Sequence, residues 1–142
     1  MSVSQQESRT KIATSTPWAS LLSYSRSVEA DGHVFVSGTL PIDNQGRLVG
    51  GNDAYLQTKH VLKIIDTALL DSGLSIADVV RLRIYLTDYA DLTSVAKAQF
   101  EVFEHIRPAC TVLKSELIRE EFLVQIDVDA IRSAPKVSGE VG

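Results

Sequence analysis

A proline at position 108 marks the point in the C-terminal half of the chain where a helix must end and a strand must begin. Proline has no backbone N–H and disfavours helical backbone in the residue before it, so a helix ending near His105 cannot continue through Arg107. We expect strands at Ala109–Lys114 and Leu123–Ala130, separated by a loop. Because strand side chains alternate, the only cysteine, Cys110, shares a face with Val112 and Lys114.

The N-terminal half predicts a hairpin followed by a helix. Two extended runs, Tyr24–Val28 and His33–Thr39, are separated by a segment ending in Asp31-Gly32, a pair that supplies the positive φ angles of a tight hairpin turn. From Asp53 onward, apolar residues recur at spacings of three and four, which predicts a helix that Asn52 or Asp53 caps and Gly73 ends.

A third strand and a second helix follow. The segment Val79–Thr87 alternates, with Val80, Leu82, Ile84 and Leu86 on one side and Arg81, Arg83 and Tyr85 on the other. A helix is expected from Asp91–Ser94 to the break at Pro108. The order β-β-α-β-α-β-β predicts an α+β fold, a single mixed β-sheet with two helices on one face.

Size and composition predict one domain, because 142 residues with 44% hydrophobic residues form a single core. We place the domain at residues 17–133, with flexible segments at 1–16 and 134–142. A net charge of -4 argues against nucleic acid as a partner. The first residues lack the pattern of a secretory signal and no run is long enough for a membrane span, so a cytoplasmic protein without membrane contact is expected.

One cysteine and three histidines carry no disulfide or metal-ligand pattern. We therefore expect no metal and no cofactor.

Three short motifs carry a family resemblance. The run Pro108-Ala109-x-Thr111, the strand Val124-x-Ile126-Asp127 and the segment Phe35–Thr39 together resemble the RidA family, also called YjgF/YER057c/UK114. The resemblance covers about residues 18–132. It implies the family's order of elements and a homotrimer with small-molecule clefts between subunits.

The resemblance also implies positions for site residues. RidA-type imine deaminases use an arginine in a Pro-Ala-Arg-Ser stretch to bind the substrate carboxylate, a glutamate fifteen positions later to orient or activate water, a tyrosine of the first hairpin, and a Ser-Gly pair. Here Tyr24 and Ser37-Gly38 match, whereas Cys110 takes the arginine position and Gln125 the glutamate position. A thiol cannot form a forked ion pair, and an amide cannot take a proton. Ala109 and Thr111 flank Cys110 as expected substrate contacts.

Other charged residues are candidates to replace the missing groups. Arg26, two positions beyond Tyr24, and Lys114 are candidate anion contacts, and Asp127 or Asp129, on the face of Gln125, is a candidate base. The alternative for Arg26 and Lys114 is a solvated charge or an intersubunit ion pair. The alternative for the two aspartates is a polar outer face or cross-subunit hydrogen bonds.

Cys110 is itself a candidate nucleophile with His105 as base. The alternative for Cys110 is a small buried apolar residue.

Two functions remain open from the sequence. One is an enzyme that acts on a small imine, enamine or carbonyl compound, less acidic than amino-acid imines because the charged clamp is missing. The other is a non-catalytic small-metabolite-binding or scaffold protein.

Overall fold

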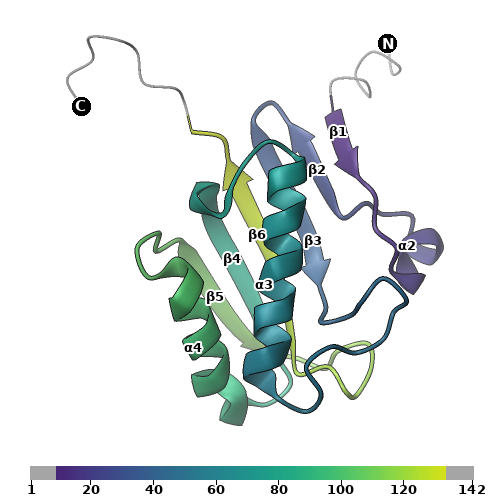
Figure 1. The fold of residues 1–142 in the computed structure, drawn as a ribbon, viewed down its shortest axis with the longest axis vertical. Coiled ribbons are helices and arrows are strands. Elements are labelled where there is room, and N and C mark those ends of the chain that lie inside the picture. Colours follow the sequence, from purple (N-terminus) through teal and green to yellow (C-terminus); the bar gives the residue numbers. More distant parts are fainter. Residues whose placement is uncertain (1–8, 134–142) are drawn as a thin grey trace.

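The computed structural model describes residues 9–133, so residues 1–8 and the expected tail 134–142 lie outside the described part. Six strands form one sheet in the order β1-β2-β3-β6-β4-β5 (Figure 1). The strands are β1 (Arg9–Ile12), β2 (Ser27–Ala30), β3 (His33–Thr39), β4 (Val79–Leu86), β5 (Ala109–Lys114) and β6 (Val124–Ile131). The helices are α2 (Pro17–Leu22), α3 (Ala54–Asp71) and α4 (Leu92–Phe103), with short 3-10 turns η1 (Ile76–Asp78) and η2 (Tyr89–Asp91).

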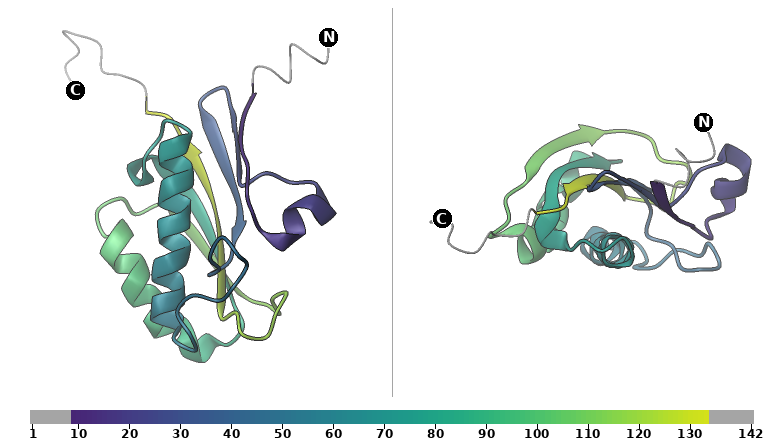
Figure 2. Two further views of the ribbon diagram at one scale, coloured as in Figure 1. Left: turned by 45° about the vertical axis from the view of Figure 1, so that its right-hand side comes forward. Right: turned by 90° about the horizontal axis from the view of Figure 1, so that it is seen from above.

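The predicted α+β architecture is confirmed. The sheet is mixed, because β4 and β5 are parallel and the other neighbours are antiparallel. The two long helices, α3 and α4, lie on the same side of the sheet (Figure 2). Their apolar faces pack onto buried strand residues that include Val34, Leu82, Leu86, Ile126 and Val128. None of the helices formed by residues 9–133 has the length and apolar character of a membrane span.

Local signals place the hairpin and the first long helix as expected. Asp31 and Gly32 have φ angles of 57° and 82°, the left-handed backbone that joins β2 to β3. Asp53 caps α3 by accepting hydrogen bonds from the backbone N–H groups of Tyr55 and Leu56. Gly73, with φ of 81°, follows the C-terminus of that helix.

A single buried side chain on α3 makes hydrogen bonds to two loops that are far apart in the sequence. The Gln57 carboxamide is fully buried, and its Nε2 donates to the carbonyl oxygens of Gly51 (2.8 Å) and Glu121 (2.9 Å). Its Oε1 accepts from the backbone N–H of Leu123 at 2.8 Å. Gln57 therefore fixes the loop before α3 and the loop before β6 to the same point of the core.

The N-terminal boundary of the sheet differs from the prediction. Residues 9–12 fall in the segment expected to be flexible, yet they pair with β2 in antiparallel register from Arg9↔Ala30 to Ile12↔Ser27. This short polar run shows no alternation of apolar and polar residues, so its sequence does not predict a strand. The strand forms through backbone pairing with β2 rather than through burial of an apolar face. The sheet therefore begins at Arg9, before the expected domain boundary at residue 17.

The backbone at the start of β4 and at Arg107 also differs from what the sequence predicts. The register between β4 and β6 shifts between Val79 and Arg81, so Val79 is buried and Val80 is 43% exposed, contrary to the alternation predicted for Val80. Before Pro108, Arg107 takes a left-handed conformation with φ of 53° instead of the expected extended one. That turn closes α4, because the Arg107 N–H donates to the Phe103 carbonyl oxygen.

Candidate functional site

The sheet face that α3 and α4 do not cover, here called the open face, carries most of the polar candidates. Directly paired residues share a face of a sheet, and the register pairs Tyr85 with Gln125 and Arg83 with Asp127. The residues between them, such as Ile84 and Ile126, pair on the buried side. Apolar side chains also lie on the open face: Phe35, Leu113 and Ile131 are 42–49% exposed.

Gln125 lies directly against Gly38 within one chain. A Cβ atom at position 38 would overlap the Gln125 Nε2 and would lie 3.1 Å from its Cδ. The irregular register of β3 between Val36 and Thr39 brings this glycine beside β6. The structure therefore joins two of the expected site positions, Gln125 and the Ser37-Gly38 pair, on the same subunit.

A Gly38→Ala substitution is expected to lower the free energy of unfolding by no more than about 1 kcal/mol, because the new methyl group displaces only the flexible end of the half-buried Gln125 side chain. A Gly38→Ala/Gln125→Ala variant should recover most of that loss, since the overlapping atoms are then absent. Urea denaturation of both variants and of Gln125→Ala alone measures the coupling. Equal loss in the presence and absence of the Gln125 side chain would contradict the contact.

Asp127 is held in a polar network on the open face. Its Oδ1 accepts from Arg83 Nη1 at 2.7 Å, and its Oδ2 accepts from the Tyr85 hydroxyl at 2.8 Å. Arg83 Nη2 also lies 3.5 Å from Asp129 Oδ2. The hydrogen bond to Asp127 raises the pKa of Arg83, and burial together with that carboxylate raises the pKa of Tyr85. Asp127 therefore forms an ion pair and a hydrogen bond within its own chain, and these two contacts compete with the role of a free base.

Cys110 lies away from Gln125 in the same chain. It pairs with the buried Leu82, so it faces the helix side, while Gln125 faces the open side. Its neighbours Ala109 and Thr111 pair with Arg81 and Arg83 and face the open side. Because β5 is the last strand of the sheet, all three residues are exposed at its edge.

The Cys110 thiol lacks the surroundings of an activated nucleophile. Partial burial raises the pKa of Cys110, which disfavours the thiolate. The side chain of the candidate base, His105, is 88% exposed, and its Nε2 lies 3.8 Å from Glu104 Oε1. No hydrogen bond between Cys110 and His105 occurs among residues 9–133. The nucleophile hypothesis therefore gains no support from the geometry.

Tyr24 and Ser37 are both tied to the N-terminal part of the chain. The Tyr24 hydroxyl lies 2.8 Å from Thr16 Oγ1, and the Ser37 hydroxyl donates to the Ser25 carbonyl oxygen at 2.7 Å. Tyr24 follows α2 and precedes β2, so it lies outside the strand that was predicted to start there. These bonds fix Tyr24 near the chain segment that leads into β2.

Arg26 lies elsewhere than its expected place beside Tyr24 on a strand face. Strand β2 begins only at Ser27, so alternation does not apply to residues 24 and 26. The guanidinium donates from Nη1 to Thr39 Oγ1 and from Nη2 to Thr14 Oγ1, both at 2.9 Å. Thr39 pairs with the buried Ile126, which places Arg26 on the helix side of the sheet, away from the open face. Within one chain, Arg26 therefore lies on the opposite side of the sheet from Gln125.

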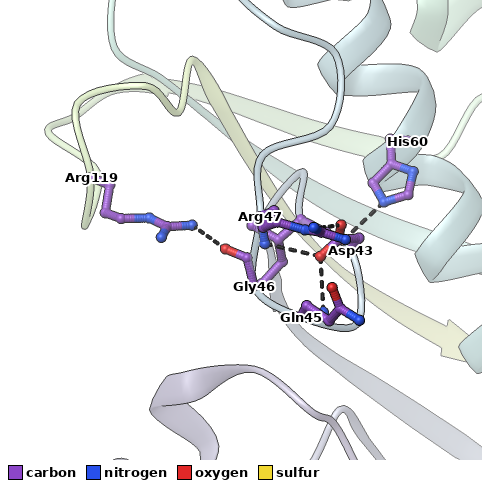
Figure 3. A network of polar contacts seen from close by, with 7 residues as sticks. Asp43, Gln45, Gly46, Arg47, His60 and Arg119 are labelled. Carbon is purple, nitrogen blue, oxygen red and sulfur yellow. Dashed lines mark hydrogen bonds and ion pairs between the residues drawn. The ribbon is translucent and has the colours of Figure 1, made fainter.

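Residues 42–47 form a polar turn, a stretch whose sequence predicts a turn but which was not proposed as part of a site. Asp43 accepts from the backbone N–H groups of Gln45 and Arg47 and from Arg47 Nε (Figure 3). His60 Nε2 lies 2.9 Å from the Ile42 carbonyl oxygen, and Arg119 Nη2 donates to the Gly46 carbonyl oxygen at 2.7 Å. The sequence signal was the Asp-Asn-Gln-Gly-Arg run, which is typical of a turn that an aspartate closes.

Comparisons with known proteins show which chains this one resembles. Residues 14–132 match the family model described as Endoribonuclease L-PSP. The 3-aminoacrylate deaminase RutC of Acinetobacter baylyi is 36% identical over 106 residues, which are 75% of this chain and 84% of the relative. An uncharacterized protein of Streptomyces coelicolor is 32% identical over 125 residues, 87% of this chain and 92% of the relative.

Solved structures share the fold over almost the whole domain. Rv2704 of Mycobacterium tuberculosis, described as a member of the highly conserved YjgF/YER057c/UK114 family, is 34% identical. It superposes with a TM-score of 0.79 and covers 87% of this chain and 99% of its own.

Proposed function

Because the chain belongs to the RidA family (YjgF/YER057c/UK114), we propose that it hydrolyses a small imine or enamine of low acidity, or binds the related carbonyl compound, in a cleft between subunits. The observation that carries this proposal is the packing of the Gln125 carboxamide against Gly38 on the open face. This contact supports a preserved pocket wall in which the family's glutamate is replaced by an amide.

A second copy of the chain is needed to complete such a cleft. Cys110 and Gln125 face opposite sides of the sheet and are separated by β4, so one chain does not bring them together. Strand β5 presents an unpaired edge, and the open face carries exposed Phe35 and Leu113. We propose a homotrimer in which the β5 edge of one subunit lies beside the Gln125 wall of the next.

The proposed reaction consumes one water molecule. Water adds to the C=N carbon, its proton passes to the nitrogen, and the resulting carbinolamine collapses to a carbonyl compound and ammonia. Gln125 would orient the water or the substrate nitrogen by hydrogen bonding, because its carboxamide both donates and accepts. The missing guanidinium at Cys110 favours an uncharged substrate over a carboxylate. The name of the relative RutC, a 3-aminoacrylate deaminase, supports this reaction class.

The non-catalytic alternative is favoured by a separate observation. An amide at position 125 cannot accept a proton, and both oxygens of the neighbouring Asp127 are already bonded. The same pocket would then bind a small carbonyl metabolite without turning it over.

RNA cleavage, which the family model's description names, has less support. The chain has a net charge of -4, and Asp127 and Asp129 compensate the Arg83 charge on the open face.

A matched pair of substrates tests the proposal. We expect the protein to hydrolyse 2-iminopropionamide, generated in situ, faster than the buffer does and at least as fast as it hydrolyses 2-iminopropionate. Gln125→Leu should lower the rate about tenfold or more, because the orienting hydrogen bond is lost. Gln45→Leu, on an exposed turn, serves as the control. The measurement is the rate of imine loss.

If no imine is turned over, ligand binding distinguishes the non-catalytic alternative from the failure of both proposed functions. If neither imine is hydrolysed above the buffer rate but pyruvamide raises the melting temperature of the unmodified protein and not of Gln125→Leu, the binding alternative holds. If neither turnover nor binding occurs, both functions are wrong.

A further inference from the structure

A cavity of about 470 Å³ lies on the helix side of the sheet, opposite to the open face. Its walls are α3, the segment at residues 12–16 that leads from β1 to α2, and the turn at residues 42–44. Ile12, Ile42 and Ile64 supply apolar wall, whereas Thr14 and Thr16 supply hydroxyl groups. The cavity is therefore separate from the Gln125 wall described above.

A buried cation lines this cavity. The Arg26 side chain is one of its lining residues and Arg26 is only 7% exposed. Its bonds go to two neutral hydroxyl groups, those of Thr39 and Thr14. Within residues 9–133, no carboxylate lies within ion-pairing distance of this guanidinium. Burial without a counter-charge disfavours the charged form and lowers the pKa of Arg26. A buried guanidinium normally has an anionic partner.

The other charged groups of the cavity do not supply that partner. Asp43 is engaged by Arg47 and by the backbone N–H groups of its own turn. Asp71 lies at the end of α3 and makes no ion pair in the described part of the chain. Lys63 is a further lining cation and is likewise without an ion pair there. Asp71 is exposed, whereas Arg26 is buried and has no carboxylate partner within residues 9–133, so the buried part of the lining favours an incoming negative charge.

We propose that this cavity binds a small carboxylate with a short apolar chain, the carboxylate at Arg26 and Lys63 and the chain against Ile12, Ile42 and Ile64. Arginine presents a planar fork that matches a carboxylate, and two of its N–H groups are already directed by Thr14 and Thr39. The apolar walls match a ligand with a hydrocarbon part better than a compact inorganic anion. This site would act independently of the proposed imine chemistry.

Amide chemical-shift mapping with butyrate tests the proposal. We expect butyrate to shift the amide signals of residues 12–16 and 60–67 and to leave those of Gly38 and Gln125 unchanged. Arg26→Gln should weaken butyrate binding about tenfold or more, and Lys63→Gln about threefold. Lys97→Gln removes an exposed charge on α4, outside the cavity, and should bind butyrate as the unmodified protein does.

Several results would overturn the assignment. These are the absence of any butyrate-induced shift, shifts centred on Gly38 and Gln125, or butyrate affinity in Lys63→Gln equal to that in Lys97→Gln. Inorganic phosphate binding as tightly as butyrate would refute the preference for an apolar carboxylate. If Arg26→Gln fails to fold, the comparison of Lys63→Gln with Lys97→Gln decides. Loss of imine hydrolysis in Gln125→Leu with unchanged butyrate binding would separate this site from the proposed function.

Discussion

A Cys110→Arg/Gln125→Glu variant is expected to hydrolyse 2-iminopropionate about a hundred times faster than the unmodified protein, or more. The arginine would supply the forked charge pair for the substrate carboxylate, and the glutamate would supply a base for the attacking water. Glutamate has nearly the shape of Gln125 and fits against Gly38, and the exposed β5 edge leaves room for a longer side chain at position 110. Steady-state kinetics of imine loss measures the gain.

The two single variants separate the contribution of the base from that of the carboxylate contact. Gln125→Glu alone should mainly raise kcat, because it adds the base, whereas Cys110→Arg alone should mainly lower KM for the carboxylate substrate. Cys110→Ser is the control for removal of the thiol. A double variant that keeps its oligomeric state and shows no gain would refute the assignment of positions 110 and 125 to one cleft.

The second large effect concerns stability. Gln57→Leu is expected to lower the free energy of unfolding by about 3 kcal/mol, about 1 kcal/mol for each of the three hydrogen bonds lost. Leucine fills similar space but leaves the Leu123 N–H and the Gly51 and Glu121 carbonyl oxygens without this partner. Urea denaturation followed by circular dichroism gives the difference.

Gln99 provides a matched control on the other long helix. Its Oε1 is buried and has no hydrogen-bond partner within residues 9–133. Gln99→Leu should therefore leave stability unchanged or increase it, because an unpaired polar atom is removed from the interior. Equal destabilisation by both substitutions would show that side-chain shape, and not hydrogen bonding, governs the effect at Gln57.

Elements with strong local signals were predictable from the sequence. Asp31-Gly32 specifies its turn by backbone conformation alone, and Asp53 and Gly73 mark the ends of α3 by capping. Val80 was assigned to the wrong side because a bulge depends on how β4 pairs with β6, which strand periodicity does not contain. The same reason explains residues 9–12, whose strand exists through pairing with β2.

The candidate site was predictable only in part. The family resemblance implied Gln125 and Ser37-Gly38 as site positions, and the structure places Gln125 against Gly38. It did not show that Cys110 faces the other side of the sheet, since that depends on the parallel register with β4. Arg26 was misplaced because strand alternation was extended to residues that precede β2, where its side chain bonds Thr14 and Thr39 instead.

The separation of Cys110 from Gln125 within one chain has a genetic consequence. If each cleft takes one wall from each of two neighbours, a defect at position 110 and a defect at position 125 damage different halves of every cleft. Two such mutant alleles expressed together would form mixed assemblies in which some contacts join the two undamaged halves. Activity absent from either mutant alone would then return in the heterozygote.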